Sequence, residues 1–241
     1  MSLLVSVIGA GAMGSGIAQV AASNDSAVTI VDSSPQALEN SQSKLKSILN
    51  RLVEKRKINK EESQHIISNI NWSSEMNEIS NSNLVIEAIV ENMEIKQILF
   101  SQMESLVSDD CILATNTSSL SVAGIASVCN NPSRIMGIHF FNPAPLMKLV
   151  EVIPTNETDG DLLKYSNPSL ICQFTTQCNT SLYALFYYIT ICQYETPWFP
   201  PHNSLGFQRV LNHGVLNVFT RATINLQSGT NEARYVSIGD H

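Results

Sequence analysis

A glycine motif close to the first residue constrains the fold more than any other feature of the chain. Residues 9–14 read Gly-Ala-Gly-Ala-Met-Gly, after an apolar run at 3–8 and before a helical stretch at 12–23. In a strand–turn–helix unit of this kind, the first glycine permits the bend and the second lets a phosphate approach the backbone. The third lets the helix pack close to the strand. The residues that we expect to form this phosphate-binding turn are Gly9, Gly11, Ala12, Met13 and Gly14.

An acidic residue completes the motif. Asp32 ends the second apolar run, where a carboxylate can accept hydrogen bonds from both ribose hydroxyls and repel a 2′-phosphate. The start of the helix adds free N–H groups and a partial positive charge for the phosphates. We therefore expect a dinucleotide site that prefers NAD to NADP. The alternative is that the glycines serve tight packing only and that Asp32 caps a helix.

Strand-like and helix-like segments alternate up to about residue 154. The expected strands are 3–8, 28–31, 84–89, 112–115 and 135–140, and the expected helices are 12–23, 35–57, 61–68, 92–107 and 119–128. Ser34-Pro35 and Asn92 are typical helix starts. Such alternation favours a parallel sheet that is covered on both faces. We therefore predict an α/β fold with a Rossmann-type domain over residues 1–154.

Charge and hydropathy argue against several classes of function. The formal charge of −7 argues against a nucleic-acid-binding protein. No apolar run approaches the roughly 20 residues that span a bilayer. The first residues resemble neither a signal nor a transit peptide, so we expect a cytoplasmic protein, or a mitochondrial matrix protein if a leader was removed. The five cysteines show no metal-binding spacing, so no metal site is expected, and we interpret Cys111 and Cys129 as apolar core residues.

A histidine and a glutamate mark the candidate catalytic centre. His139 ends the apolar run 135–138, and strand ends at the carboxyl edge of a parallel sheet face the ligand crevice. Histidine titrates near neutral pH and can take a hydroxyl proton while hydride leaves the same carbon. We expect Glu151 to hold the other ring nitrogen and to fix the tautomer. Spacing alone leaves an alternative open, in which His139 is a hydrogen-bonded core residue and Glu151 an exposed strand residue.

Four motifs occur in order along the first part of the chain. They are Gly9-Ala-Gly-Ala-Met-Gly-Ser-Gly-Ile-Ala-Gln19, Glu87-Ala-Ile-Val-Glu-Asn92, Asn116-Thr-Ser-Ser119, and His139-Phe-Phe-Asn-Pro143 followed by Met147-Lys-Leu-Val-Glu-Val152. In sequence and spacing, residues 1 to about 154 resemble the 3-hydroxyacyl-CoA dehydrogenase family, which includes 3-hydroxybutyryl-CoA enzymes. The resemblance implies NAD-dependent oxidation of a 3-hydroxyacyl-CoA to the 3-oxoacyl-CoA, in fatty acid β-oxidation or butanoate metabolism.

The resemblance also implies catalytic roles. His139 would be the general base and Glu151 its partner. Ser118 and Asn142 would bind the substrate oxygen and position the nicotinamide. Two ordinary alternatives stay open, in which Ser118 is a helix N-cap and Asn142 a turn residue before proline.

Three charged residues receive binding roles in the same way. Glu91 and Lys96 would line the cofactor cleft, and Lys55, in a basic cluster at residues 51–57, would contact the phosphates of CoA. The alternative for all three is a solvated surface charge.

The second part of the chain departs from the family pattern. Family members continue into a helical domain that closes the cleft and forms the homodimer. In this chain, residues 155–241 carry only 10 charged residues, against 25 in residues 1–154, and residues 165–194 carry none. We predict that residues 155–241 are an incomplete or divergent, mostly helical remnant of that domain. Our preferred explanation is a segment read partly out of frame, and the alternative is a genuine divergent tail.

Two further functions stay open. The first is that of a catalytically impaired NAD-binding or structural protein, since relatives of this family serve as lens crystallins. The other is a hydroxy-acid dehydrogenase on the same scaffold.

Overall fold

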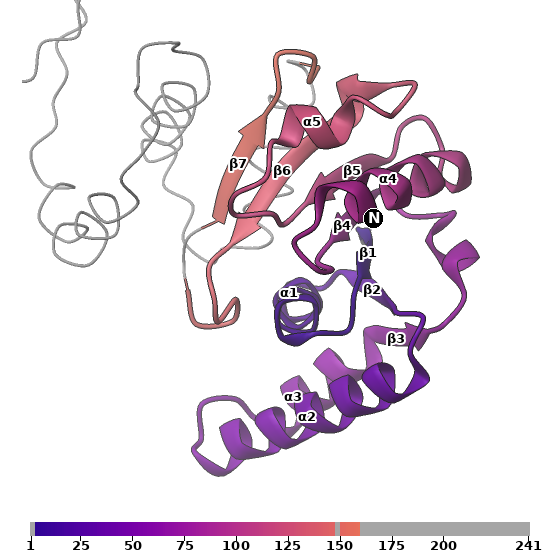
Figure 1. Ribbon diagram of the computed structural model, residues 1–241. Helices are drawn as coiled ribbons and strands as arrows, with labels where there is room; N and C mark the ends of the chain where they lie inside the picture. Colours follow the sequence, from indigo (N-terminus) through magenta and orange to yellow (C-terminus); the bar gives the residue numbers. More distant parts are fainter. Residues whose placement is uncertain (1–2, 148–149, 160–241) are drawn as a thin grey trace, which may run out of the picture. The chain divides into compact units, whose positions relative to one another are not determined.

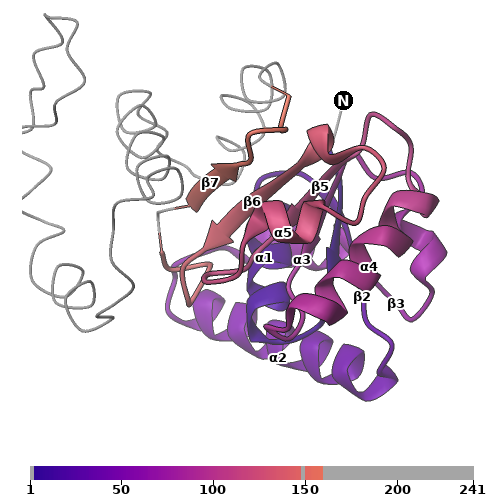
Figure 2. The same cartoon turned by 45° about the horizontal axis from the view of Figure 1, so that its top comes forward.

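A computed structural model describes residues 3–147 and 150–159 of the chain. These residues form a seven-stranded sheet in the order β3-β2-β1-β4-β5-β6-β7 (Figure 1). Its strands are β1 (Leu4–Ile8), β2 (Ala27–Val31), β3 (Ile70–Ser73), β4 (Leu84–Glu87), β5 (Ile112–Thr115), β6 (Ile135–Phe140) and β7 (Val150–Pro154). Strands β1 to β6 run parallel, and β7 pairs antiparallel with β6 at the edge (Figure 2).

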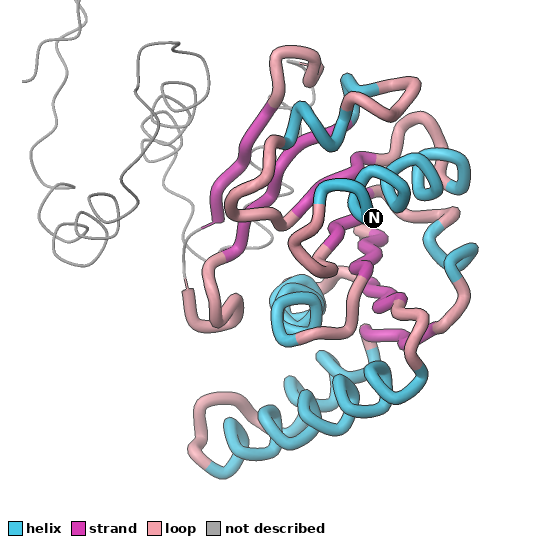
Figure 3. The backbone as a smooth tube through the Cα atoms, in the orientation of Figure 1, coloured by secondary structure: helices cyan, strands magenta, loops and turns pink. Residues whose placement is uncertain are grey.

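Helices cover both faces of this sheet, as Figure 3 shows by type of element. They are α1 (Ala12–Ser23), α2 (Pro35–Glu54), α3 (Lys60–Ser68), α4 (Met93–Leu106) and α5 (Val122–Ala126), with short 3₁₀ turns η1 (Met76–Ile79) and η2 (Pro132–Arg134). Residues of α1, α2 and α3 pack with one face of the sheet, and residues of α4, α5 and η1 pack with the other. Since both faces are buried, strand β4 is buried along its whole length.

The predicted α/β fold is confirmed, and both expected helix starts are correct. The Ser34 side chain accepts a hydrogen bond from the N–H of Ala37 at the start of α2, and Asn92 accepts one from Ile95 at the start of α4. The expected parallel sheet is present in β1 to β6, and it gains one antiparallel strand at its edge, where β7 pairs with β6.

One strand and several boundaries also differ from the prediction. Strand β3 was not expected, because its four residues follow α3 directly and carry too short a pattern to distinguish from a loop. Helix α2 ends at Glu54 rather than at residue 57, since Arg56 adopts a left-handed backbone with φ 54°. Helix α5 begins only after Ser121, which caps it. Of the predicted second domain, residues 160–241 lie outside the described residues.

The glycine turn has the geometry that its sequence predicts. Gly9 has φ +108°, a conformation that side chains rarely adopt. A Cβ atom on Gly14 would lie 1.9 Å from the carbonyl oxygen of Gly9, so α1 packs against the turn too closely for any side chain. A Cβ atom on Gly11 would meet nothing within 4 Å. The three glycines therefore meet three different physical requirements, and only Gly11 borders open space.

Candidate active site

The ends of the parallel strands β4, β5 and β6 and the start of α1 line a cavity of about 330 Å³ at the carboxyl edge of the sheet. This is where an open α/β sheet binds its ligands. A hollow of about 470 Å³ lies at the opposite edge, but it contains none of the predicted site residues, so its greater size does not make it the better candidate. The cavity at the carboxyl edge is lined by Met13, Ala88, Ile89, Glu91, Lys96, Asn116, Ser118, His139, Phe140, Phe141 and Asn142.

The glycine turn and Asp32 form a cradle suited to a dinucleotide. Helix α1 begins after Gly11 without a side-chain cap, so its first N–H groups are available to an anion. One carboxylate oxygen of Asp32 accepts the N–H of Ala10 at 2.8 Å, and the other accepts the N–H of Ser34 at 2.9 Å. Asp32 therefore joins the end of β2 to the glycine turn. The cap of α2 is Ser34, so the alternative reading of Asp32 as that cap is not what the structure has.

The antiparallel edge strand brings the predicted catalytic pair together. His139 on β6 and Glu151 on β7 are register partners, and Nδ1 of the imidazole lies 2.8 Å from Oε2 of the carboxylate. The two side chains are 16% and 28% exposed, so the pair is partly shielded from water. The ring of Phe141 packs beside the imidazole with a centroid distance of 4.8 Å. Because Nδ1 is held by Glu151, Nε2 is the ring nitrogen left to exchange a proton.

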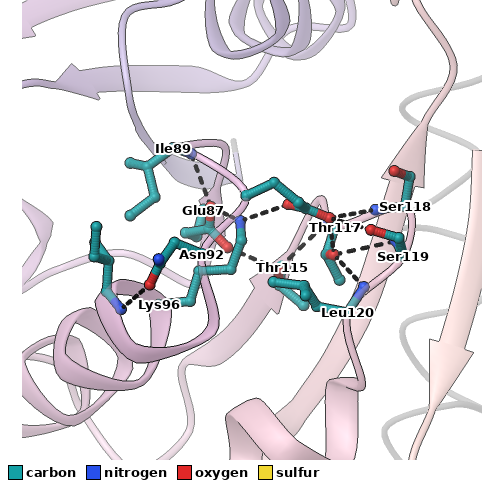
Figure 4. A network of polar contacts seen from close by, with 11 residues as sticks. Glu87, Ile89, Asn92, Lys96, Thr115, Thr117, Ser118, Ser119 and Leu120 are labelled. Carbon is teal, nitrogen blue, oxygen red and sulfur yellow. Dashed lines mark hydrogen bonds and ion pairs between the residues drawn. The ribbon is translucent and has the colours of Figure 1, made fainter.

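Glu91 and Lys96 belong to a network of polar contacts beside the cavity (Figure 4). Nζ of Lys96 lies 2.5 Å from Oε1 of Glu87 and 3.3 Å from Oε2 of Glu91. The Glu91 carboxylate also accepts hydrogen bonds from the hydroxyls of Thr117 and Ser119 and from the N–H of Ser118. The alternative of two solvated charges does not hold for Lys96, which is 1% exposed.

The environment of Glu91 favours its ionised form. Burial raises the pKa of the carboxyl, but the hydrogen bond from Thr117 and the positive charge of Lys96 outweigh that effect. The pKa of Glu91 is therefore lowered from the usual value of a glutamate, so this group carries a negative charge at neutral pH.

The other predicted residues fall partly inside this region. Ser118 and Asn142 line the cavity. The alternative in which Ser118 is a helix N-cap is wrong, because Ser121 caps α5. The peptide bond between Asn142 and Pro143 is cis, in keeping with a turn. Lys55 lies at the C-cap of α2 and is absent from the cavity lining.

Sequence reasoning gave no role to three residues that support the cavity. Asn116 accepts the N–H of Phe140 at 2.8 Å and thereby joins the ends of β5 and β6. Thr117 donates to Glu91, and Glu87 holds Lys96. All three lie in the motifs that carry the family resemblance, and this position was the only sign of their importance in the sequence. Their contacts join different strands, loops and helices, so they could not be inferred from the spacing of residues along the chain.

Cys111 fits the expectation of an apolar core residue. Its side chain is 1% exposed, and burial raises the pKa of the thiol to about 11. Because the thiolate is the reactive form, only about one thiol in a thousand is ionised at about pH 8. We expect Cys111 to resist iodoacetamide in the folded protein and to react fully in urea, as mapped by peptide mass spectrometry. Modification in the folded state at the rate of a free thiol would contradict the buried position.

Known proteins match mainly the first part of this chain. The family model described as 3-hydroxyacyl-CoA dehydrogenase, NAD binding domain, matches residues 4–168. A probable 3-hydroxybutyryl-CoA dehydrogenase of Bacillus subtilis is 45% identical over 149 residues, which cover 62% of this chain and 52% of that protein. The mitochondrial hydroxyacyl-coenzyme A dehydrogenase of Sus scrofa is 39% identical over 166 residues, which cover 66% of this chain and 53% of that protein.

A solved structure agrees with these relatives in fold. The crystal structure of a 3-hydroxybutyryl-CoA dehydrogenase from Escherichia coli superposes with a TM-score of 0.70 at 36% identity, over 72% of this chain and 37% of that one. This chain spans about half the length of the curated relatives named above. In the described part of this chain, no helix is long and apolar enough to cross a membrane. The match over residues 4–168 shows that the chain belongs to the 3-hydroxyacyl-CoA dehydrogenase family, through its NAD-binding domain.

Proposed function

We propose that this protein catalyses the NAD-dependent oxidation of a 3-hydroxyacyl-CoA to the 3-oxoacyl-CoA. The observation that carries the proposal is the His139–Glu151 pair, which stands at a cavity that also contains Ser118 and Asn142, inside an NAD-binding domain. A general base, two polar groups for an oxygen and a cofactor cradle are the parts that an alcohol oxidation needs.

The cradle fits NAD on three observations. The space beside Gly11 is open, the start of α1 is uncapped, and the Asp32 carboxylate is fixed at the end of β2. When bound, NAD supplies the hydride acceptor. The residues that would hold it are Gly9, Gly11, Ala12, Met13, Gly14, Asp32, Glu91, Lys96, Ser118 and Asn142.

The chain's own groups account for the proton and the oxygen. Nε2 of His139 would take the proton of the substrate hydroxyl, and Glu151 would stabilise the imidazolium that forms. Ser118 and Asn142 would donate hydrogen bonds to the oxygen, whose partial negative charge changes as the carbonyl forms. In the reverse direction, His139 would give the proton back.

The remaining parts of the proposal concern substrate, assembly and location. An acyl-CoA substrate agrees with the names of the relatives, and Lys55 would contact its phosphates. The proposed division is an NAD-binding domain at 1–154 and, at 155–241, a divergent remnant of the helical domain that forms the homodimer in the family. The proposed location is the cytoplasm or the mitochondrial matrix, and the pig relative is named as a mitochondrial protein.

The direct test is oxidation of NADH by the 241-residue chain with acetoacetyl-CoA as acceptor. Turnover above a no-enzyme control, and none with free acetoacetate, supports a CoA-dependent dehydrogenase. Turnover of free hydroxy acids but not of CoA thioesters would replace the proposal by a hydroxy-acid dehydrogenase. NADH binding without any turnover would instead indicate a non-catalytic NAD-binding protein.

Asp32 is expected to set the choice between the two cofactors. Asp32→Ala should weaken NADH binding by about tenfold and reduce the preference over NADPH, because the variant neither binds ribose hydroxyls nor repels a 2′-phosphate. Titration of both cofactors by their fluorescence measures the two dissociation constants. Asp25→Ala, which removes an exposed carboxylate at the opposite end of β2, is the control. An unchanged NADH-to-NADPH ratio in Asp32→Ala would remove this residue from the site.

A further inference from the structure

The carboxylate of Glu87 is the most deeply buried charged group beside the cavity. Its side chain is 0% exposed, and it ends β4 opposite Thr115 of β5. It contacts Nζ of Lys96 at 2.5 Å, the hydroxyl of Thr115 at 2.7 Å and the N–H of Ile89 at 2.7 Å. Nothing in the reaction proposed above requires this residue. Burial of a carboxylate nevertheless costs free energy of folding unless opposite charges and hydrogen bonds compensate for the lost water.

Lys96 stands between two carboxylates of unequal exposure. Glu87 on one side is fully buried, whereas Glu91 on the other is 38% exposed and lines the cavity. The two separations, 2.5 Å and 3.3 Å, give the stronger contact to the buried partner. The three groups together carry one uncompensated negative charge, and of the two carboxylates only that of Glu91 is exposed and lines the cavity.

This charge matters because the two states of the cofactor differ in charge. The nicotinamide ring is positive when oxidised and neutral when reduced. A reacting ring must enter the cavity that contains His139, and Glu91 and Lys96 line the same cavity. A net negative charge at this place therefore stabilises the oxidised form relative to the reduced form.

We propose that Glu87 is a positioning residue that holds Lys96 and keeps its charge from neutralising Glu91, and thereby sets the relative affinity of the site for NAD⁺ and NADH. The proposal rests on the NAD site proposed above. In this proposal, Lys96 sets the net charge of the cleft in addition to contacting the cofactor.

The variants separate charge from packing. Glu87→Gln keeps the size of the side chain but leaves Lys96 to compensate Glu91, which makes the three groups neutral. Glu87→Gln combined with Lys96→Met removes both buried charges and restores the single negative charge of Glu91. Thr115→Val removes a hydrogen bond to Glu87 and changes no charge, so it is the matched control for loosened packing.

The measurement is the ratio of the dissociation constants of NAD⁺ and NADH, obtained by calorimetry and fluorescence on the 241-residue chain. In Glu87→Gln the ratio should rise by roughly tenfold, the size expected for one unit charge acting across several ångströms. This equals a shift of about 30 mV in the potential of the bound couple, toward positive values. Thr115→Val should stay within about threefold of the unmodified protein. The double variant also removes a residue proposed to hold the cofactor, so both of its dissociation constants should rise together, while their ratio returns to within about threefold of the unmodified value.

Three results would overturn the proposal. The first is an unchanged ratio in Glu87→Gln while the unmodified protein binds both cofactors, which would leave the NAD site itself intact. The second is a double variant that stays as far from the unmodified protein as Glu87→Gln. The third is an unmodified chain that binds neither cofactor, which would overturn the NAD site as well. If Glu87→Gln alone does not fold, the double variant must still reproduce the unmodified ratio, and Lys96→Met must not raise it.

Discussion

His139→Gln is expected to lower kcat for the reduction of acetoacetyl-CoA by roughly 10³-fold, while the dissociation constant of NADH changes less than about twofold. Glutamine preserves much of the volume and can still accept a hydrogen bond, but it cannot give up or take a proton near neutral pH. Stopped-flow absorbance of NADH gives the rate, and fluorescence titration gives the affinity. A large loss of kcat with an unchanged dissociation constant of NADH indicates a catalytic base. A residue that only shapes the cavity would change the dissociation constant as well.

Two matched variants sharpen this expectation. His65→Gln removes an exposed histidine on α3, which pairs with Asp25 away from the cavity, and should leave the rate unchanged. Glu151→Gln keeps a partner for Nδ1 but loses the charge that stabilises the imidazolium, so a loss of about 10²-fold is expected. If His139→Gln retained more than a tenth of the rate, another group would have to carry the proton.

The parallel strands near the middle of the sheet and the main helices were predictable because each has a local signal. The alternation of apolar strands with helical stretches defines the parallel part of the sheet, and Ser34 and Asn92 mark helix starts by their own hydrogen bonds. Edge strands lacked such a signal. Strand β3 has four residues with no clear period, and the direction of β7 depends on its pairing with β6 rather than on its composition.

The candidate site divides in the same way. The positions of His139 and Glu151 in the sequence suggested a pair, but only the antiparallel register of β6 and β7 places their side chains 2.8 Å apart. The burial of Glu87 and Lys96 was not predictable, because it depends on how the end of β4 meets helix α4. Charged side chains are usually exposed to solvent. The sequence alone therefore gives no reason to place Glu87 and Lys96 in the interior.

Gly14→Ala is expected to destabilise the protein by about 3 kcal/mol or more, because the new Cβ atom would lie 1.9 Å from the carbonyl oxygen of Gly9. The two closest atoms belong to the backbone of Gly9, so no side-chain rotation can relieve the contact. Within a helix, alanine is otherwise favoured over glycine by about 1 kcal/mol, so helix propensity works against the expected loss. Urea unfolding followed by circular dichroism measures the change in free energy.

Gly11→Ala provides the matched comparison, since the same atom added three residues earlier would meet nothing within 4 Å. Gly11 also has φ −68°, which alanine adopts without strain. Its stability should therefore change by less than about 0.5 kcal/mol. The methyl group would, however, occupy the open space where a pyrophosphate approaches the start of α1, so NADH affinity should fall by about tenfold or more. A stable Gly14→Ala protein would contradict the packing role of Gly14, and unchanged NADH binding in Gly11→Ala would show that the glycine turn serves packing alone.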